Sequence, residues 1–203
     1  MEPIEFLRQD EKLKPVIEKI GMVKIHKRKN ICLHLCSSIM SQQLSTKVAR
    51  VFHQRFLNLY GKKEPTAQQI INTPFETLRG IGLSNAKAAY VQNVSRFFIE
   101  KEITDKQLYQ LSNDEVIALL TQIKGVGKWT VEMILMFTLG REDVFAIDDL
   151  GLQQAVIGLY DLKHRKKKIM QDKILKISEQ WSPYRTYASM YLWRWKDNEP
   201  GIE

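Results

Sequence analysis

The sequence predicts an all-α protein, and two observations support that prediction. Patterns typical of helix N-termini recur along the chain, and no stretch alternates convincingly between apolar and polar residues as a half-buried strand does. The chain has 203 residues, of which 44% are hydrophobic. It is therefore long enough for one sizeable domain or for two small lobes that share a core. We expect roughly nine or ten helices.

Helices outside the central part of the chain are predicted from their capping residues and from the apolar spacing that follows. Thr66-x-x-Gln69 and Thr104-x-x-Gln107 are capping-box patterns, and Pro74 stands at a first helical position, where proline is favoured. In chain order these helices are expected at about 4–20, 31–60, 67–71, 74–79 and 84–101, from 104 onward, and from Ser182-Pro183 to about Trp195.

The central part of the chain predicts a helix-hairpin-helix motif at about residues 113–139. Ser112 and Glu115 form a capping box, and the apolar residues that follow have the i, i+3, i+4, i+7 spacing of an amphipathic helix. Gly125 and Gly127 interrupt this spacing, as glycine does where the chain needs a positive φ or another backbone approaches closely. Residues 129–139 are almost all apolar, which predicts a buried second helix.

A hairpin of this kind can bind an anion. It presents backbone N–H groups at the N-terminus of the second helix, where the helix dipole adds to their effect. Lys124 and Lys128 flank the glycines and have no obvious partner, so a phosphate is the expected ligand. The alternative is a plain glycine turn between two packed helices, and the Gly-x-Gly pattern taken alone favours that alternative.

Asp148 and Asp149 stand just before the run LGLQQAVIGLY. The simpler interpretation is an N-cap, because aspartate is a preferred capping residue and the run that follows is helical in character. Taken alone, the pair favours this interpretation, and a catalytic role is implied only by the family that the wider pattern resembles. That pattern combines a phosphate-binding hairpin, a buried connecting helix and a carboxylate 22 residues after Gly127.

Five segments, taken in order, resemble the helix-hairpin-helix (HhH-GPD) superfamily of DNA glycosylases, and within it the 3-methyladenine DNA glycosylase II branch. They are IMSQQLSTKVA (39–49), LRGIGLSNAKAAYV (78–91), IKGVGKWT (123–130), VFAIDDLGL (144–152) and WSPYRTYASMYLWRW (181–195). The resemblance implies a single glycosylase unit made of two helical lobes, with the active cleft between them. Lobe one would cover about 38–143, and lobe two about 1–37 plus 144–203.

The resemblance also implies the residues of the reaction. Asp149 would oppose the positive charge of an oxocarbenium-like sugar and orient water. Asp148 would lie beside it as a cap or as part of the base pocket, which Trp129, Trp193 and Met133 would line. The alternative for both tryptophans is a place in the core. The family often has proline just before the aspartates, whereas this chain has Ala146 and Ile147 there, which leaves the rigidity of the loop open.

DNA contacts follow from the same resemblance. Gln43 would fill the gap that a flipped nucleotide leaves, although two adjacent glutamines are equally typical of a surface. Gly125, Gly127, Lys124 and Lys128 would bind phosphate. The basic run at 163–168 is at least as typical of a solvated helix start as of a DNA contact.

Cofactor expectations are limited to one ion. By resemblance, backbone carbonyls of Thr121, Ile123 and Val126 would hold a monovalent cation, Na⁺ or K⁺, which would stiffen the hairpin. The four-cysteine iron–sulfur cluster of some family members is not expected, because no cysteine follows Cys36. Cys32 and Cys36 lie four apart on one probable helix, where core packing is the favoured interpretation.

The function that this pattern predicts is a monofunctional glycosylase that excises alkylated purines from damaged double-stranded DNA. A net charge of +8 is compatible with a polyanionic partner, although many soluble proteins are as basic. We expect a monomer with no membrane partner, located in the cytoplasm (on the nucleoid if bacterial). Two alternatives remain open: a glycosylase/lyase for oxidised bases, and a non-catalytic helix-hairpin-helix DNA-binding module. Trp129 argues against the lyase, because bifunctional relatives have lysine at that position.

Overall fold

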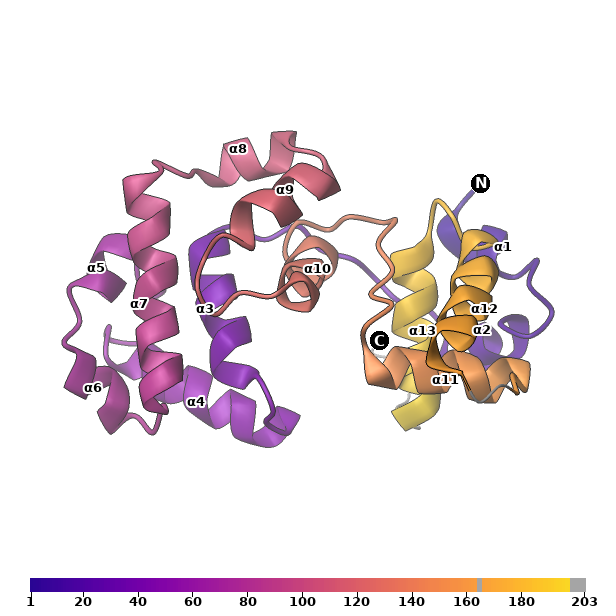
Figure 1. The fold of residues 1–203 in the computed structure, drawn as a ribbon, viewed down its shortest axis with the longest axis horizontal. Coiled ribbons are helices and arrows are strands. Elements are labelled where there is room, and N and C mark those ends of the chain that lie inside the picture. Colours follow the sequence, from indigo (N-terminus) through magenta and orange to yellow (C-terminus); the bar gives the residue numbers. More distant parts are fainter. Residues whose placement is uncertain (164–165, 198–203) are drawn as a thin grey trace. The chain divides into compact units, whose positions relative to one another are not determined.

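The computed structural model describes residues 1–163 and 166–197, and every regular element in that part of the chain is a helix (Figure 1). The predicted all-α class is therefore confirmed, with thirteen helices among the described residues. In chain order they are α1 (Pro3–Leu7), α2 (Lys14–Ile20), α3 (Ile31–Ser41), α4 (Thr46–Asn58), α5 (Ala67–Ile71), α6 (Phe75–Gly80), α7 (Asn85–Glu100), α8 (Asp105–Gln110), α9 (Asn113–Leu120), α10 (Lys128–Phe137), α11 (Leu150–Tyr160), α12 (Lys167–Glu179) and α13 (Arg185–Asp197).

The chain forms two compact units. The central unit is Lys27–Leu139, and the terminal unit combines residues 1–26 with the described residues from 140 onward. The sequence placed the first boundary at residue 38, which would cut through α3. The structure places it before α3, because this continuous helix packs against α7 and α10 of the central unit.

Helix α7 is at the centre of the central unit. Its buried residues are Ala88, Val91, Val94, Ser95 and Phe98, and it packs on α3, α5 and α6. Three helix starts around it are fixed by local capping boxes as predicted, at Thr66, Thr104 and Ser112. The start of α6 differs from the prediction: Pro74 is its N-cap, without a side-chain cap, rather than its first helical residue.

The start of α3 has a local cap, since the Asn30 side chain accepts a hydrogen bond from the Leu33 N–H (3.3 Å). It is also held from a distance: the Asp105 carboxylate accepts hydrogen bonds from the backbone N–H groups of Asn30 (2.6 Å) and Ile31 (3.0 Å).

Two predicted long helices are each divided into two. The stretch 4–20 is α1 and α2, because the Asp10 carboxylate accepts the backbone N–H groups of Lys12 and Leu13 and closes a turn between them. The stretch 31–60 is α3 and α4. The intervening turn at 42–45 contains Gln43 in the left-handed region (φ 60°), and Ser45 caps α4.

The terminal unit has its own core, in which α11 packs on α13 and α2 packs on α13. Trp181 and Tyr191 are fully buried there. The Tyr191 hydroxyl donates to the Gly21 carbonyl (2.9 Å), and the Trp181 indole donates to Asp10 (2.9 Å). The start of α13 is held by Arg185, which makes a two-point contact with the Asp143 carboxylate (2.6 and 2.9 Å). The core therefore fixes α13 against α11.

Among the described residues, no helix combines the length and the apolar character that crossing a membrane requires.

Candidate functional site

Asp149 is the N-cap of α11, and two donors meet on one of its carboxylate oxygens. The backbone N–H of Leu152 donates to Oδ1 at 2.7 Å, and the indole Nε1–H of Trp193 donates to the same oxygen at 2.9 Å. The first bond is the local cap that the sequence predicts. The second comes from α13, 44 residues away. Together they fix the orientation of the carboxylate at the start of the helix.

Gly151 leaves room beside the contact between Asp149 and Trp193. A Cβ at this position would lie 3.2 Å from Asp149 Oδ1 and 3.6 Å from the Trp193 ring atoms Cδ1 and Nε1. Its role was missed from the sequence, although a glycine two residues after the aspartate was the available signal. Asp148 precedes the cap with an exposed side chain, so of the two aspartates only Asp149 is the N-cap of α11.

The loop before the aspartates is held without the proline that is frequent in the resembled family. Ala146 and Phe145 are buried, and the Phe145 ring packs against Trp181 with 5.9 Å between ring centroids. The Gln153 side chain donates to the Ile147 carbonyl at 2.7 Å. Packing and this hydrogen bond therefore support the loop that leads to Asp149.

The predicted hairpin joins α9 and α10 in the central unit. Gly125 has a φ of +103°, and a Cβ there would overlap the ring of Tyr90 on α7. The side chain of Asn93, also on α7, donates to the Lys124 carbonyl at 3.3 Å. Gly127 is different: its φ is −94°, and a Cβ there would meet nothing within 4 Å.

Gly127 is the N-cap of α10 and has no side chain to cap it. The N–H groups of the first turn of a helix have no partner within the helix, so this terminus can bind a phosphate. The expectation that Lys128 lacks a partner was wrong. Its ammonium lies 3.6 Å from the carboxylate of Glu132 one turn further on, and the Glu132 side chain is buried. Lys124 is exposed.

Three large apolar side chains follow one another along α10, one turn apart. Trp129 is 38% exposed, Met133 is half-buried and Phe137 is 40% exposed. We call these three residues the α10 stripe. The alternative that Trp129 is a core residue is wrong, because the core of the central unit is formed by the opposite side of α10. Trp193 is half-buried against the terminal core, and Trp181 is wholly within it.

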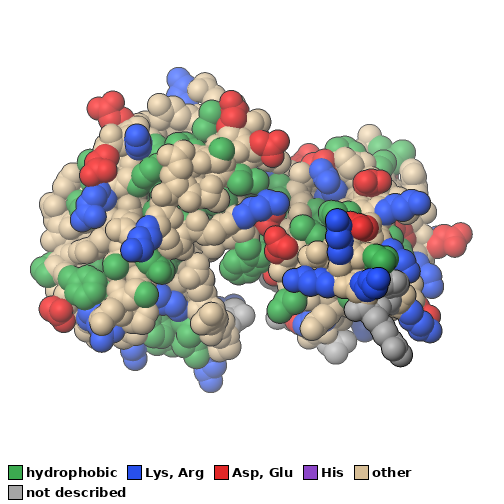
Figure 2. Space-filling model, in the orientation of Figure 1, with side chains coloured by type: hydrophobic (Ala, Val, Ile, Leu, Met, Phe, Trp, Pro, Cys, Tyr) green, Lys and Arg blue, Asp and Glu red, His purple; other side chains and the backbone are tan. Residues whose placement is uncertain are grey.

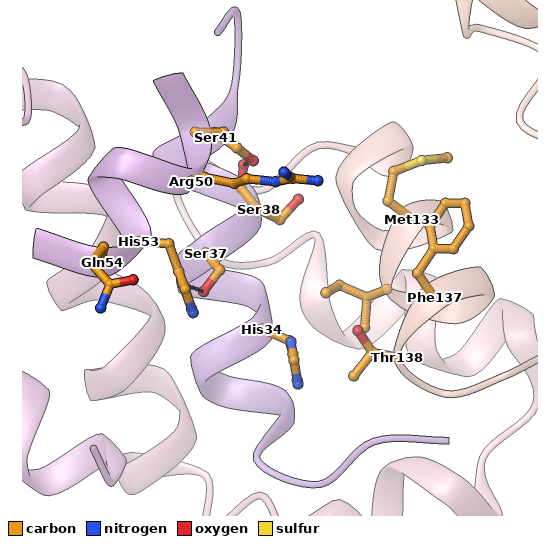
Figure 3. A pocket seen from close by; sticks show the side chains of 12 residues that line it. His34, Ser37, Ser38, Ser41, Arg50, His53, Gln54, Met133, Phe137 and Thr138 are labelled. Carbon is orange, nitrogen blue, oxygen red and sulfur yellow. Dashed lines mark hydrogen bonds between the residues drawn. The ribbon is translucent and has the colours of Figure 1, made fainter. Parts of the chain in front are cut away.

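A cavity of about 500 Å³ in the central unit adjoins the α10 stripe (Figure 3). Met133 and Phe137 line one side of it, and α3 and α4 supply polar groups on the other. There Ser37 Oγ lies 3.2 Å from His53 Nδ1. Burial, followed by the charge of Arg28, lowers the pKa of His34. Sequence reasoning missed this cavity, although one signal existed, a polar series at i, i+3, i+4 and i+7 on α3: His34, Ser37, Ser38 and Ser41.

Gln43 is exposed in the turn between α3 and α4. Its left-handed backbone is uncommon for a residue other than glycine and is often found where function requires a fixed geometry. The neighbouring Gln42 side chain donates to Thr130 Oγ1 on α10 at 3.2 Å. The turn is thus attached to the helix that begins at the hairpin.

Charge alone does not mark the site. On the face shown in Figure 2, Lys and Arg side chains are scattered among Asp and Glu rather than gathered into one patch. The basic run at 163–168 includes residues 164–165, which lie outside the described residues. Recognition of an anion is therefore better argued from the hairpin than from the net charge.

Comparison with known proteins decides the family. A model of the HhH-GPD superfamily of base excision DNA repair proteins matches residues 36–180. The chain is 36% identical over 191 residues to DNA-3-methyladenine glycosylase 1 of Schizosaccharomyces pombe. The matched region covers 91% of this chain and 82% of that protein. The chain belongs to the HhH-GPD superfamily.

Solved structures agree with this assignment. The S. pombe 3-methyladenine DNA glycosylase in complex with abasic DNA matches with a TM-score of 0.84 and 32% identity, over 96% of both chains. A DNA-3-methyladenine glycosidase from Bacillus halodurans matches with a TM-score of 0.82 and 32% identity, over 97% of this chain and 89% of that one. The matched family region includes both the hairpin and Asp149 of this HhH-GPD chain.

The structure groups the expected HhH-GPD site residues by unit. In the terminal unit it brings Asp149 and Trp193 into direct contact. In the central unit α10, whose N-cap is Gly127, presents the α10 stripe, and the side chain of Gln42, next to Gln43, is hydrogen-bonded to the same helix. Cys32 and Cys36 are both buried in α3, as their spacing suggested. Within the described residues, no cluster of three or more His, Cys, Asp or Glu side chains forms a metal site.

The two hairpin glycines allow a matched test. Gly125→Ala is expected to lower the free energy of unfolding by about 1–3 kcal/mol, because a left-handed alanine is strained and its Cβ overlaps Tyr90. Gly127→Ala meets no neighbour, so its cost should be limited to the poorer capping preference of alanine, about 0.5–1 kcal/mol. Urea unfolding of both variants measures the difference. Equal losses of stability would contradict this account of the hairpin.

Proposed function

We propose that this chain is a monofunctional DNA glycosylase that hydrolyses the N-glycosidic bond of alkylated purines, such as 3-methyladenine and 7-methylguanine, in damaged double-stranded DNA. The observation that best supports the proposal is the Asp149 carboxylate, held by the Leu152 N–H and the Trp193 indole. The names of the relatives agree with it: the S. pombe and B. halodurans proteins are both 3-methyladenine glycosylases.

Asp149 would stabilise the positive charge that develops on the sugar. When the glycosidic bond breaks, its electron pair leaves with the base and the deoxyribose becomes oxocarbenium-like. A fixed carboxylate beside C1′ would stabilise that positive charge and orient the water whose oxygen bonds to C1′, with the proton that this water loses passing to the carboxylate and then to solvent. The two hydrogen bonds to Oδ1 keep the carboxylate from rotating. Because the carboxylate is already oriented before the reaction, no free energy is needed to reorient it in the transition state.

The α10 stripe would select the base. An N-alkylated purine carries positive charge, so it is both attracted to an aromatic face and already a good leaving group, which makes a general acid unnecessary. A tryptophan face attracts a cation by roughly 1–2 kcal/mol when water is excluded. Trp129 has the exposure that stacking requires, and Met133 next to it can adapt to the shape of the base.

The hairpin would hold the DNA backbone. The first N–H groups of α10 would donate hydrogen bonds to a phosphate, since Gly127 leaves that helix terminus open. Carbonyls of Thr121, Ile123 and Val126 would hold Na⁺ or K⁺ beside it. They suit such an ion because Ile123 and Val126 have buried side chains, which fix their backbone, and because carbonyl oxygens are ligands for monovalent cations. DNA as the partner is supported by the relative that was solved with abasic DNA.

The side chain that follows the hairpin makes the proposed reaction monofunctional. A lyase step needs an amine that forms a Schiff base with the sugar. Trp129 has none, and Lys128 is engaged with Glu132. Borohydride treatment during incubation with 8-oxoguanine-containing or abasic DNA is therefore expected to trap no covalent protein–DNA adduct on a denaturing gel. An adduct would favour the bifunctional alternative.

Asp149→Asn tests the central proposal. Asparagine is as good an N-cap as aspartate, so α11 should keep its start while the negative charge is lost. Release of 3-methyladenine from methylated DNA, measured by chromatography of the free bases, should fall at least about a hundredfold. Affinity for the same DNA should be retained. Asp148→Asn is the control, and it should release bases nearly as fast as the unchanged protein.

Undiminished base release by Asp149→Asn would remove this carboxylate from the mechanism. Strong DNA binding by the unchanged protein without release from any alkylated substrate would favour a non-catalytic binding module instead.

Trp193→Phe separates the hydrogen bond from the aromatic ring. Phenylalanine keeps an apolar ring on α13 but cannot donate to Asp149 Oδ1. We expect kcat to fall about tenfold, because the carboxylate is held by one donor instead of two. Single-turnover rates of base release measure this effect. A variant with unchanged rates would show that the indole N–H is not needed to orient the carboxylate.

A further inference from the structure

Lys87 makes a contact that neither the family resemblance nor the proposed reaction assigns. It lies in the first turn of α7, and its ammonium donates to the backbone carbonyls of Met40 (3.0 Å) and Gln42 (2.7 Å). These carbonyls belong to the C-terminal end of α3, where a helix leaves carbonyls without partners and its dipole favours a cation. Lys87 therefore supplies the charge that the end of α3 lacks.

The position of Lys87 on its own helix is unfavourable. A cation in the first turn of a helix opposes the dipole of that helix. Partial burial adds to the cost and lowers the pKa of Lys87. Ser84 already caps α7, so the lysine is not needed there. The contact with α3 thus accounts for the presence of this lysine better than any role within α7.

Of the two carbonyls that Lys87 binds, that of Gln42 stands directly before the left-handed residue Gln43, and that of Met40 lies three residues before it. A non-glycine residue keeps that conformation only when its surroundings fix it. Two further hydrogen bonds help: the Gln42 side chain donates to Thr130, and the backbone N–H of Leu44 donates to the Ser41 carbonyl (3.1 Å). Thr130 belongs to α10 and Lys87 belongs to α7, so Gln42 is hydrogen-bonded to both helices and the turn is held from two sides.

The same part of α7 also contacts the hairpin. Tyr90 lies against Gly125, and Asn93 donates to the Lys124 carbonyl. Residues 87, 90 and 93 follow one another at three-residue spacing along one side of the helix. One rigid helix, which packs beside α3 (Figure 1), therefore contacts both the turn that presents Gln43 and the hairpin that presents backbone N–H groups.

We infer that Lys87 is a positioning residue for base flipping: by binding the carbonyls of Met40 and Gln42, it fixes the turn from which Gln43 enters the DNA stack. Helix α7 sets the distance from that turn to the phosphate-binding hairpin. The inference rests on the proposed function for its biological meaning. Insertion of Gln43 is a separate physical event from bond cleavage, so each can be measured without the other.

The test uses a DNA duplex with a stable abasic-site analogue and 2-aminopurine opposite it. Insertion of a side chain changes the stacking of 2-aminopurine and hence its fluorescence. We expect a clear change with the unchanged protein and its loss with Lys87→Met, which keeps a long chain but has no donor. Lys87→Arg should restore most of the signal, because guanidinium can donate to two carbonyls. Lys101→Met is the control for lost charge, since Lys101 is exposed at the other end of α7.

The coupling to Gln43 distinguishes positioning from general stability. Gln43→Ala should lose the same fluorescence signal, and the double variant should lose no more than either single one. In base-release assays Lys87→Met should lower kcat about tenfold or more, since small misplacements of reacting groups are costly. Its affinity for undamaged DNA should match that of Lys101→Met. Circular dichroism at the assay temperature confirms that each variant is folded.

Four results would overturn the inference: no signal from the unchanged protein, an unaltered signal from Lys87→Met, no rescue by arginine, or additive losses with Gln43→Ala. A normal insertion signal without any release of alkylated bases would leave the inference standing and would overturn the proposed function instead.

Discussion

The structure of the candidate site depends on one oxygen atom, Oδ1 of Asp149, which accepts a hydrogen bond from its own helix and another from Trp193 on α13. The first bond places the carboxylate at the start of α11, and the second requires α13 to pack tightly on α11. Gly151 eases that packing, since a Cβ there would lie tightly against Asp149 Oδ1, at 3.2 Å. The core around Trp181 and Tyr191 therefore stabilises the terminal unit and also keeps Trp193 within hydrogen-bonding distance of Asp149.

Capping does not compete with the catalytic role proposed for this aspartate. A capping residue must hold its side chain in one orientation to accept a backbone N–H, and an electrostatic catalyst must also be held in one orientation. The cap supplies this fixed orientation at no extra cost in side-chain entropy. In the central unit, backbone geometry does similar work: Gly125 and Gln43 both have positive φ, and α7 contacts the chain beside each of them.

Interactions between residues close in the sequence were predicted well. Capping boxes at Thr66, Thr104 and Ser112, the Gly-Val-Gly hairpin and the cap at Asp149 all form as expected. Each joins groups only a few residues apart, so the order of residue types is sufficient to specify it. Two local signals were missed: the turn around Asp10 and the cap at Ser45 each end one helix and begin another, but continuous apolar spacing across both suggested single long helices.

The sequence by itself determined the helical class, most helix starts, the hairpin and the identity of the candidate carboxylate. Only the tertiary structure decided which groups meet that carboxylate, which side of α10 exposes Trp129, and how Lys87 reaches the carbonyls beside Gln43. It also decided that α3 belongs wholly to the central unit. These contacts join residues tens of positions apart. They form only when the helices pack, and helix packing depends on how whole apolar surfaces fit together rather than on any short pattern.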